Sequence, residues 1–241
     1  MFTLLKRPLY VLSNKLRRHI RASRREPVEW MNEKWIADFS KPEKSCFIIK
    51  PEISYSAKLE KTPSLKKNIH SPEAIHSGEN ALFLGLKKIN CMAWLETEKR
   101  VYVNQLIESS FRFDSQGGYC AAGIMFRIAE PGSYYLALVS SKGFFRLDAV
   151  NNNILKPLIG WTEIQDFPAY EAQLSMIAYS DHLVFFINGK WIAEAYNASI
   201  PGGHLGFALV SYESAGNADE EYSCRAWLDY LSVDSRAHVV R

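Results

Sequence analysis

The chain has 241 residues, of which 47% are hydrophobic and 23% are charged, an ordinary composition for a globular protein with one sizeable core. No apolar run approaches the roughly 18 residues that a membrane-spanning helix needs. The four cysteines show no CxxC spacing, which argues against a zinc site and leaves open whether they form disulfides.

The net charge of +3 is unevenly distributed along the chain. Residues 1–25 contain eight Lys and Arg and no Asp or Glu, so the other residues carry a net charge of −5. Leu9, Leu12, Leu16 and Ile20 recur at helical spacing, which predicts a short basic amphipathic helix. Three interpretations remain open: a helix that binds an anionic membrane surface or an acidic partner, an organellar transit peptide, and a solubilising tail or a helix docked on the protein's own body.

The leader does not resemble a secretory signal peptide, because no uninterrupted apolar core precedes a small-residue cleavage site. We therefore expect a cytoplasmic protein, with a peripheral membrane position as the alternative. We assign residues 1–40 to a basic extension and connector, and residues 41–241 to the folded domain. Within the connector, Pro27 suits the first position of a helix, and two helical turns are predicted over residues 28–36.

Strand signals begin weakly and then become continuous. Residues 46–49 form a short apolar run, residues 53–59 alternate between apolar and polar, and residues 61–78 form a predicted loop. From residue 81 onward, apolar segments with turn residues between them follow at short intervals and show no helical periodicity. The predicted strands cover residues 81–86, 106–113, 120–127, 134–140, 144–150, 174–179, 182–187, 190–196, 205–210 and 225–233.

The clearest turn signal is Asn188-Gly189, because both residues tolerate positive φ and suit a two-residue hairpin. In the predicted strand just before this turn, Leu183, Phe185 and Ile187 face one side of the sheet and Val184 and Phe186 face the other. A strand that is apolar on both faces is predicted to be central in its sheet and covered on both sides. The whole series predicts an all-β fold, an antiparallel sandwich or barrel.

Several landmarks of the strand region resemble the concanavalin A-like lectin/glucanase superfamily, which includes laminin G-like modules and 3-keto-disaccharide hydrolase-like domains. The resemblance covers residues 102–233. It is carried by the order and spacing of Gly123-Ile124-Met125-Phe126-Arg127, Tyr134-Tyr135-Leu136, Leu183–Lys190, Gly203–Phe207 and Ala226–Val233. It implies an antiparallel jelly-roll β-sandwich, preceded here by the short basic helical extension. In this superfamily the same fold serves lectins, glycosidases, adhesion modules and spacers, so it does not by itself give a function.

Catalytic signals are weak. Glucanases of this superfamily carry a Glu-apolar-Asp-apolar-x-Glu stretch, and the sequence contains none. The nearest substitutes are Glu96 with Glu98, and Asp219-Glu220-Glu221, and both groups resemble solvated loops. No Ser-His-Asp order, HExxH motif or phosphate-binding glycine loop is present, and the histidines do not cluster. Asp181 and Asp219 are isolated candidates for calcium ligands, without a ligand-spaced acidic loop.

A binding site is easier to predict than an active site, because sugar-binding surfaces use aromatic faces with a few polar groups. The candidate ligand-binding residues are Trp94, Glu96, Arg127, Tyr135 and Trp161; for each aromatic residue and for Arg127, a structural role in the sandwich is the alternative. We assign no catalytic residue, no metal and no cofactor, and we expect no nucleic-acid partner.

The sequence therefore predicts a non-catalytic binding or scaffolding module whose ligand is a carbohydrate or a partner protein. Two alternatives stay open. One is a glycoside-processing enzyme of the same fold. The other is a structural subunit anchored to an assembly or a membrane surface through residues 1–25.

Overall fold

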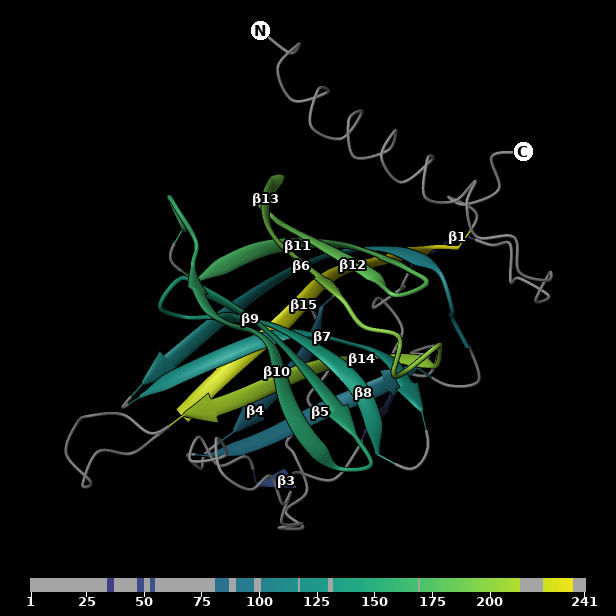
Figure 1. The fold of residues 1–241 in the computed structure, drawn as a ribbon. Coiled ribbons are helices and arrows are strands. Elements are labelled where there is room, and N and C mark those ends of the chain that lie inside the picture. Colours follow the sequence, from purple (N-terminus) through teal and green to yellow (C-terminus); the bar gives the residue numbers. More distant parts are fainter. Residues whose placement is uncertain are drawn as a thin grey trace, which may run out of the picture. The chain divides into compact units, whose positions relative to one another are not determined.

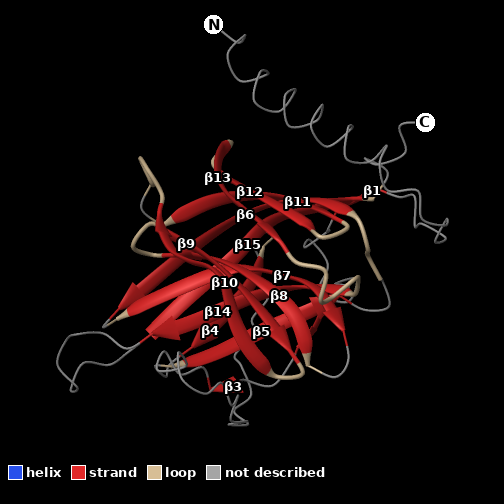
Figure 2. Cartoon of the chain, in the orientation of Figure 1, coloured by secondary structure: helices blue, strands red, loops and turns tan. Residues whose placement is uncertain are grey.

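The structure is a computed structural model. It describes residues 34–36, 47–49, 53–54, 81–86, 90–97, 101–116, 118–129, 132–168, 170–212 and 223–235. These residues form strands, turns and loops and no helix (Figure 2). The predicted leader helix, Cys46, the Asp219–Glu221 run and Glu98 lie outside the described residues, and so does the first part of the helix predicted over residues 28–36.

The strands form two antiparallel sheets, which Figure 1 shows as two layers. Sheet A has seven strands in the order β1-β15-β6-β11-β12-β13, and β4 lies beside β1 along the same edge of β15. Its members are β1 (Lys34–Ile36), β4 (Leu82–Leu86), β6 (Gln105–Gln116), β11 (Glu171–Tyr179), β12 (His182–Ile187), β13 (Lys190–Tyr196) and β15 (Ser223–Asp234).

Sheet B has eight strands in the order β10-β9-β8-β7-β14-β5-β2, and β3 lies beside β2 along the same edge of β5. Its members are β2 (Phe47–Ile49), β3 (Ile53–Ser54), β5 (Cys91–Thr97), β7 (Tyr119–Ala129), β8 (Ser133–Ser140), β9 (Phe144–Asn151), β10 (Ile154–Glu163) and β14 (His204–Tyr212). The predicted all-β sandwich is thus confirmed for the described part of the chain.

The main core lies between the two sheets and joins them through phenylalanine rings. Phe185 of sheet A lies 5.1 Å from Phe145 and 6.3 Å from Phe126 of sheet B, measured between ring centroids. Phe111 of sheet A lies 6.1 Å from Phe207 of sheet B. All five side chains are fully buried, and burial of each such side chain stabilises the fold by roughly 1.5–3 kcal/mol. The thiols of Cys91, Cys120 and Cys224 are buried in this core, where they pack as small, mostly apolar groups.

The hairpin predicted at Asn188-Gly189 is confirmed, since the two residues have φ values of 51° and 75° and join β12 to β13. Strand β12 is paired on both sides, and Val184 and Phe186 are buried, as the apolar pattern predicted.

Three elements differ from the prediction. Lys34–Ile36 is a strand paired with β15, where the sequence pattern indicated the end of a helix. Strand β5 occupies a segment whose charged end was interpreted as a loop. Strand β10 was missed because it contains Pro157 and Gly160; it lies at the edge of sheet B, where a sheet tolerates proline.

Candidate functional site

Two of the five predicted site residues lie in the interior of the sandwich. The Arg127 side chain is completely buried, and its guanidinium donates hydrogen bonds to the carbonyl oxygens of Val103 (2.9 and 3.2 Å) and Ile200 (3.1 Å). Burial lowers the pKa of Arg127, and Tyr135 beside it opposes that shift. The Tyr135 hydroxyl donates to Asn197 Oδ1 at 2.7 Å. Both side chains therefore hold loops onto the core, and neither presents an atom to a ligand in solvent.

Trp94 and Glu96 lie together on the outer face of sheet B, the side away from the main core. Trp94 is 7% exposed, and its indole Nε1 donates a 2.9 Å hydrogen bond to Glu96 Oε1. Glu96 is therefore part of strand β5 and not of the solvated loop that the sequence predicted.

Trp161 lies on β10 and is 38% exposed. The Arg146 guanidinium lies 5.6 Å from the centre of its ring, and the ring of Tyr212 meets it edge-on at 5.6 Å. Tyr212 belongs to β14, and β10 and β14 are four strand positions apart in the sheet, about 19 Å if the sheet were flat. The contact therefore requires sheet B to curl, with its outer face on the concave side.

This outer face of sheet B is packed like an interior. Its side chains form a second apolar cluster that contains no sheet A residue: Met92, Trp94, Ala121, Met125, Ile128, Tyr134, Leu136, Leu138, Val150, Leu155, Ala208 and Val210. Burial raises the pKa values of Tyr134 and Tyr212 far above the usual tyrosine value. The Tyr134 hydroxyl is buried without a hydrogen-bond partner.

Two carboxylates on this face, Glu96 and Asp148, lie on separate strands. Glu96 and Asp148 occupy one cross-strand row, but β14, β7 and β8 run between them. Asp148 is fully buried and accepts hydrogen bonds from Arg146 Nε at 2.8 and 2.9 Å. Glycosidases pair a carboxyl group that keeps its proton with an ionised one, whereas Asp148 is held in an ion pair with Arg146.

The outer face of sheet A is different, because it carries an open groove that the sequence did not reveal. Most of its lining comes from two neighbouring cross-strand rows. The first row runs Phe83, Trp227, Arg112, Glu171, and the second runs Tyr230, Ser110, Gln173, Asn188. Small Ser110 in the second row leaves space between longer neighbours. We call these eight residues together with Asp166, Pro168 and Tyr170 the sheet A groove.

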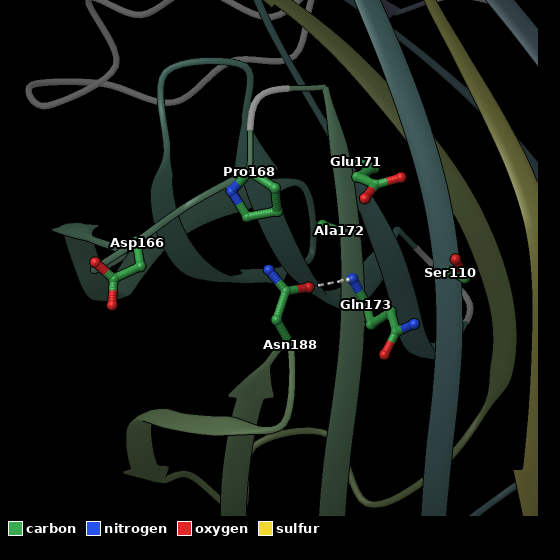
Figure 3. A pocket seen from close by; sticks show the side chains of 7 residues that line it. All are labelled: Ser110, Asp166, Pro168, Glu171, Ala172, Gln173 and Asn188. Carbon is green, nitrogen blue, oxygen red and sulfur yellow. Dashed lines mark hydrogen bonds between the residues drawn. The ribbon is translucent and has the colours of Figure 1, made fainter.

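The groove consists of two adjoining hollows that share Glu171. One has a volume of about 380 Å³ and is lined by Ser110, Asp166, Pro168, Glu171, Ala172, Gln173 and Asn188 (Figure 3). The other has a volume of about 250 Å³ and is lined by Arg112, Phe113, Tyr170, Glu171 and Trp227. The first is mostly polar, and the second has three aromatic residues beside a cation and a carboxylate.

Hydrogen bonds fix the polar end of the groove. Asn188 Oδ1 accepts from the backbone N–H of Gln173 at 2.9 Å (Figure 3). The backbone N–H of Asn188 in turn donates to the Gln173 carbonyl at 2.8 Å. Lys190 Nζ forms a 2.9 Å ion pair with Asp166, and this hydrogen bond lowers the pKa of Asp166. The β12–β13 turn is thereby tied to the loop before β11.

The aromatic end is also preorganised. Arg112 donates to both carboxylate oxygens of Asp229 at 2.8 and 2.9 Å, and its guanidinium lies 5.7 Å from the centre of the Trp227 ring. A register shift between Leu228 and Tyr230 makes Asp229 an extra residue of β15 and turns it toward Arg112. Tyr170 is 57% exposed at φ 76°, and its carbonyl accepts from Phe113 N–H at 2.9 Å. Such a strained backbone occurs at ligand-binding positions more often than elsewhere.

The groove joins residues that are distant in sequence, such as Arg112 and Asp229, and no local motif marks it. The only sequence signal is the alternation within residues 171–179, which places Glu171 and Gln173 on one exposed face. Within the residues that the structure describes, no three His, Cys, Asp or Glu side chains are grouped as a metal site requires, Asp181 included. No helix in that part of the chain could span a membrane.

Comparison with known proteins identifies the fold and a sequence relative that matches part of the chain. No family model matches the chain. A TPR repeat-containing protein of Treponema pallidum is 38% identical over 98 residues, which is 40% of this chain but only 12% of that protein.

Solved structures match over most of the chain. A native glycosidic hydrolase has a TM-score of 0.59 at 11% identity, with 86% of this chain and 97% of that one covered. A lichenase derived from a mouse hindgut metagenome has a TM-score of 0.55 at 11% identity, covering 84% and 99%. Bacillus licheniformis β-glucanase has a TM-score of 0.53 at 10% identity, covering 86% and 100%. The chain has the concanavalin A-like lectin/glucanase fold.

Proposed function

We propose that the chain is a non-catalytic binding module whose ligand is a carbohydrate, held in the sheet A groove. One observation carries this proposal: the exposed ring of Tyr170 and the half-buried ring of Trp227 lie beside planar polar groups in an open, preorganised groove. A sugar ring presents an apolar C–H face to Trp227 or Tyr170 and hydroxyl groups to the amides of Gln173 and Asn188. The sequence analysis gave a carbohydrate or a partner protein as the ligand and named other residues for the site.

The environment of the carboxylates supports binding over catalysis. On sheet B, Glu96 is bonded to Trp94 and Asp148 to Arg146. At the groove, Asp229 is held by Arg112 and Asp166 by Lys190, which leaves Glu171 as the groove carboxylate without a cation partner among the described residues. A glycosidase needs one carboxyl group that keeps its proton near neutral pH beside a second, ionised one. A cation partner favours the ionised form and thus opposes the first of these roles.

The partial relative favours a modular role. A stretch related to this chain occupies a small part of a much larger protein named for its TPR repeats. Repeat solenoids of that kind present extended binding surfaces. A sandwich joined to such an array would contribute a second binding specificity, and a partner protein remains the alternative ligand.

The proposal is tested by titrating soluble β-glucan and cello-oligosaccharides into the protein by isothermal calorimetry. We expect Trp227→Ala to weaken binding by about 10- to 100-fold, because a buried aromatic contact is worth roughly 1.5–3 kcal/mol. Tyr170→Ala serves as a second variant whose side chain is far from the core. Trp191, 54% exposed on β13 and outside the groove, provides the matched control. Equal losses in Trp191→Ala and Trp227→Ala would contradict the assigned site.

The charge of the leader favours a second, separate role. We propose that residues 1–25 attach a cytoplasmic sandwich to an anionic membrane surface or an acidic partner. Attraction to a membrane would amount to about 1 kcal/mol for each nearby cation and would weaken with salt. Deletion of residues 1–25 should leave the melting temperature unchanged and abolish co-sedimentation with anionic vesicles. A destabilised deletion together with salt-independent behaviour of the full-length chain would refute this role.

A further inference from the structure

The charges of the sheet A groove do not cancel. Arg112 forms a bidentate ion pair with Asp229, and Lys190 pairs with Asp166. These pairs neutralise two cations and two carboxylates. The Glu171 side chain is exposed and forms no hydrogen bond or ion pair with the residues that the structure describes, so the described groove carries one surplus negative charge.

The Glu171 carboxylate lies where a ligand bound along the groove would contact it. Glu171 lines both hollows and lies where they meet, so a ligand that spans the groove passes its carboxylate. The rings of Tyr170 and Trp227 line the adjoining hollow. A carboxylate beside aromatic faces attracts a cation, because both the charge and the ring quadrupoles favour it.

Arg112 is the opposing influence, since it faces Glu171 directly across the β6–β11 ladder. Its guanidinium is turned the other way, toward Asp229 and over the Trp227 ring. The two side chains do not form an ion pair despite their facing positions. Arg112 and Asp229 together add no net charge, so the groove remains attractive to a cation.

We propose that the sheet A groove selects glycans that carry free primary amines, with the ammonium group of an amino sugar placed at Glu171. This inference rests on the proposed carbohydrate-binding function and adds the chemical class of the sugar. An exposed ion pair combined with a cation–π contact corresponds to roughly 3- to 30-fold tighter binding than for a neutral sugar of the same size. The preference must shrink as salt rises, because the groove is open to solvent.

The test is calorimetry with three β-1,4-linked hexamers: glucosamine, N-acetylglucosamine and glucose. Each is titrated into the full-length chain, Glu171→Gln and Glu163→Gln, at low and at high salt. Glu163 is exposed on β10 of sheet B, so its substitution removes the same charge away from the groove. We expect the glucosamine hexamer to bind 3- to 30-fold more tightly than the other two. That preference should disappear in Glu171→Gln and persist in Glu163→Gln, while the two neutral hexamers bind all three proteins alike.

Two other outcomes separate this inference from the proposed function. Equal binding of the three hexamers, or an equal effect of the two Glu→Gln substitutions, would overturn the amine selectivity and leave a neutral glycan-binding module. Failure of every hexamer, and of the β-glucans, to bind the full-length chain would overturn the proposed function and this inference with it.

Discussion

The two outer faces of the sandwich differ in how far their side chains are buried, although both belong to the same antiparallel fold. On sheet B the outward side chains form a second apolar cluster, in which the large side chain of Trp94 is only 7% exposed. On sheet A the outward positions around β6 and β11 hold exposed Arg112, Glu171 and Gln173 around an open groove. The difference shows that burial, more than the presence of aromatic residues, decides which face of such a sandwich can receive a ligand.

The largest expected effect compares a truncation on each face. Leu136→Ala on sheet B removes a fully buried side chain and should lower the free energy of unfolding by about 2–5 kcal/mol. Gln173→Ala on sheet A removes an exposed side chain and should change it by less than about 0.5 kcal/mol. Chemical denaturation measures both. Similar losses in the two variants would mean that the two faces do not differ as described.

Alkaline pH should destabilise the sheet B face specifically. An unfolded tyrosine ionises near pH 10, whereas burial holds the pKa values of Tyr134 and Tyr212 well above that in the folded state. The folded state then keeps protons that the unfolded state loses, so stability is complete below pH 10 and falls as pH rises. The loss is about 1.4 kcal/mol per pH unit for each tyrosine. The Tyr134→Phe/Tyr212→Phe double variant should lose less stability between pH 10 and 11 than the parent; parallel curves would refute this explanation.

The β12–β13 turn sharpens the comparison, because it carries groove residue Asn188. Gly189→Val should lower the free energy of unfolding by roughly 1–3 kcal/mol, because a β-branched residue is strained at φ 75°. A Cβ at this position would meet no neighbouring atom within 4 Å, so a steric clash adds nothing to this cost. The same variant should weaken glycan binding by displacing Asn188. A thermal melt with no loss would show that the turn tolerates a β-branched residue.

The smallest effect is expected at the rim of sheet B. Trp161→Ala removes an edge-on contact with Tyr212 and a cation–π contact with Arg146, each worth roughly 0.5–1.5 kcal/mol. We expect a stability loss of about 1–2 kcal/mol and unchanged glycan affinity. A reversed result, with stability retained and binding lost, would move the ligand site to sheet B.

Much of the fold could be predicted from the sequence, because strand alternation and turn residues are local signals. The Asn188-Gly189 turn and the strands around it are examples. Strand β10 was missed since an edge strand tolerates Pro157, and β5 since its charged end resembles a loop. For Arg127 and Tyr135 the sequence left both a structural and a ligand-binding role open, because burial, which is complete for both, is a property of the assembled sandwich. The groove could not be predicted, because it pairs Arg112 with Asp229, 117 residues apart in the chain.

The most direct test of the central claim compares tryptophan indole N–H signals in a two-dimensional ¹⁵N NMR spectrum, assigned through single Trp→Phe variants. The chain has six tryptophans, of which Trp227 reports on sheet A and Trp94 and Trp161 report on sheet B. On addition of the glycan that binds most tightly, we predict that the Trp227 signal shifts in proportion to saturation while the Trp94 and Trp161 signals stay in place. Saturable shifts of Trp94 or Trp161 with an unmoved Trp227 would contradict the account and place the ligand on the concave face of sheet B.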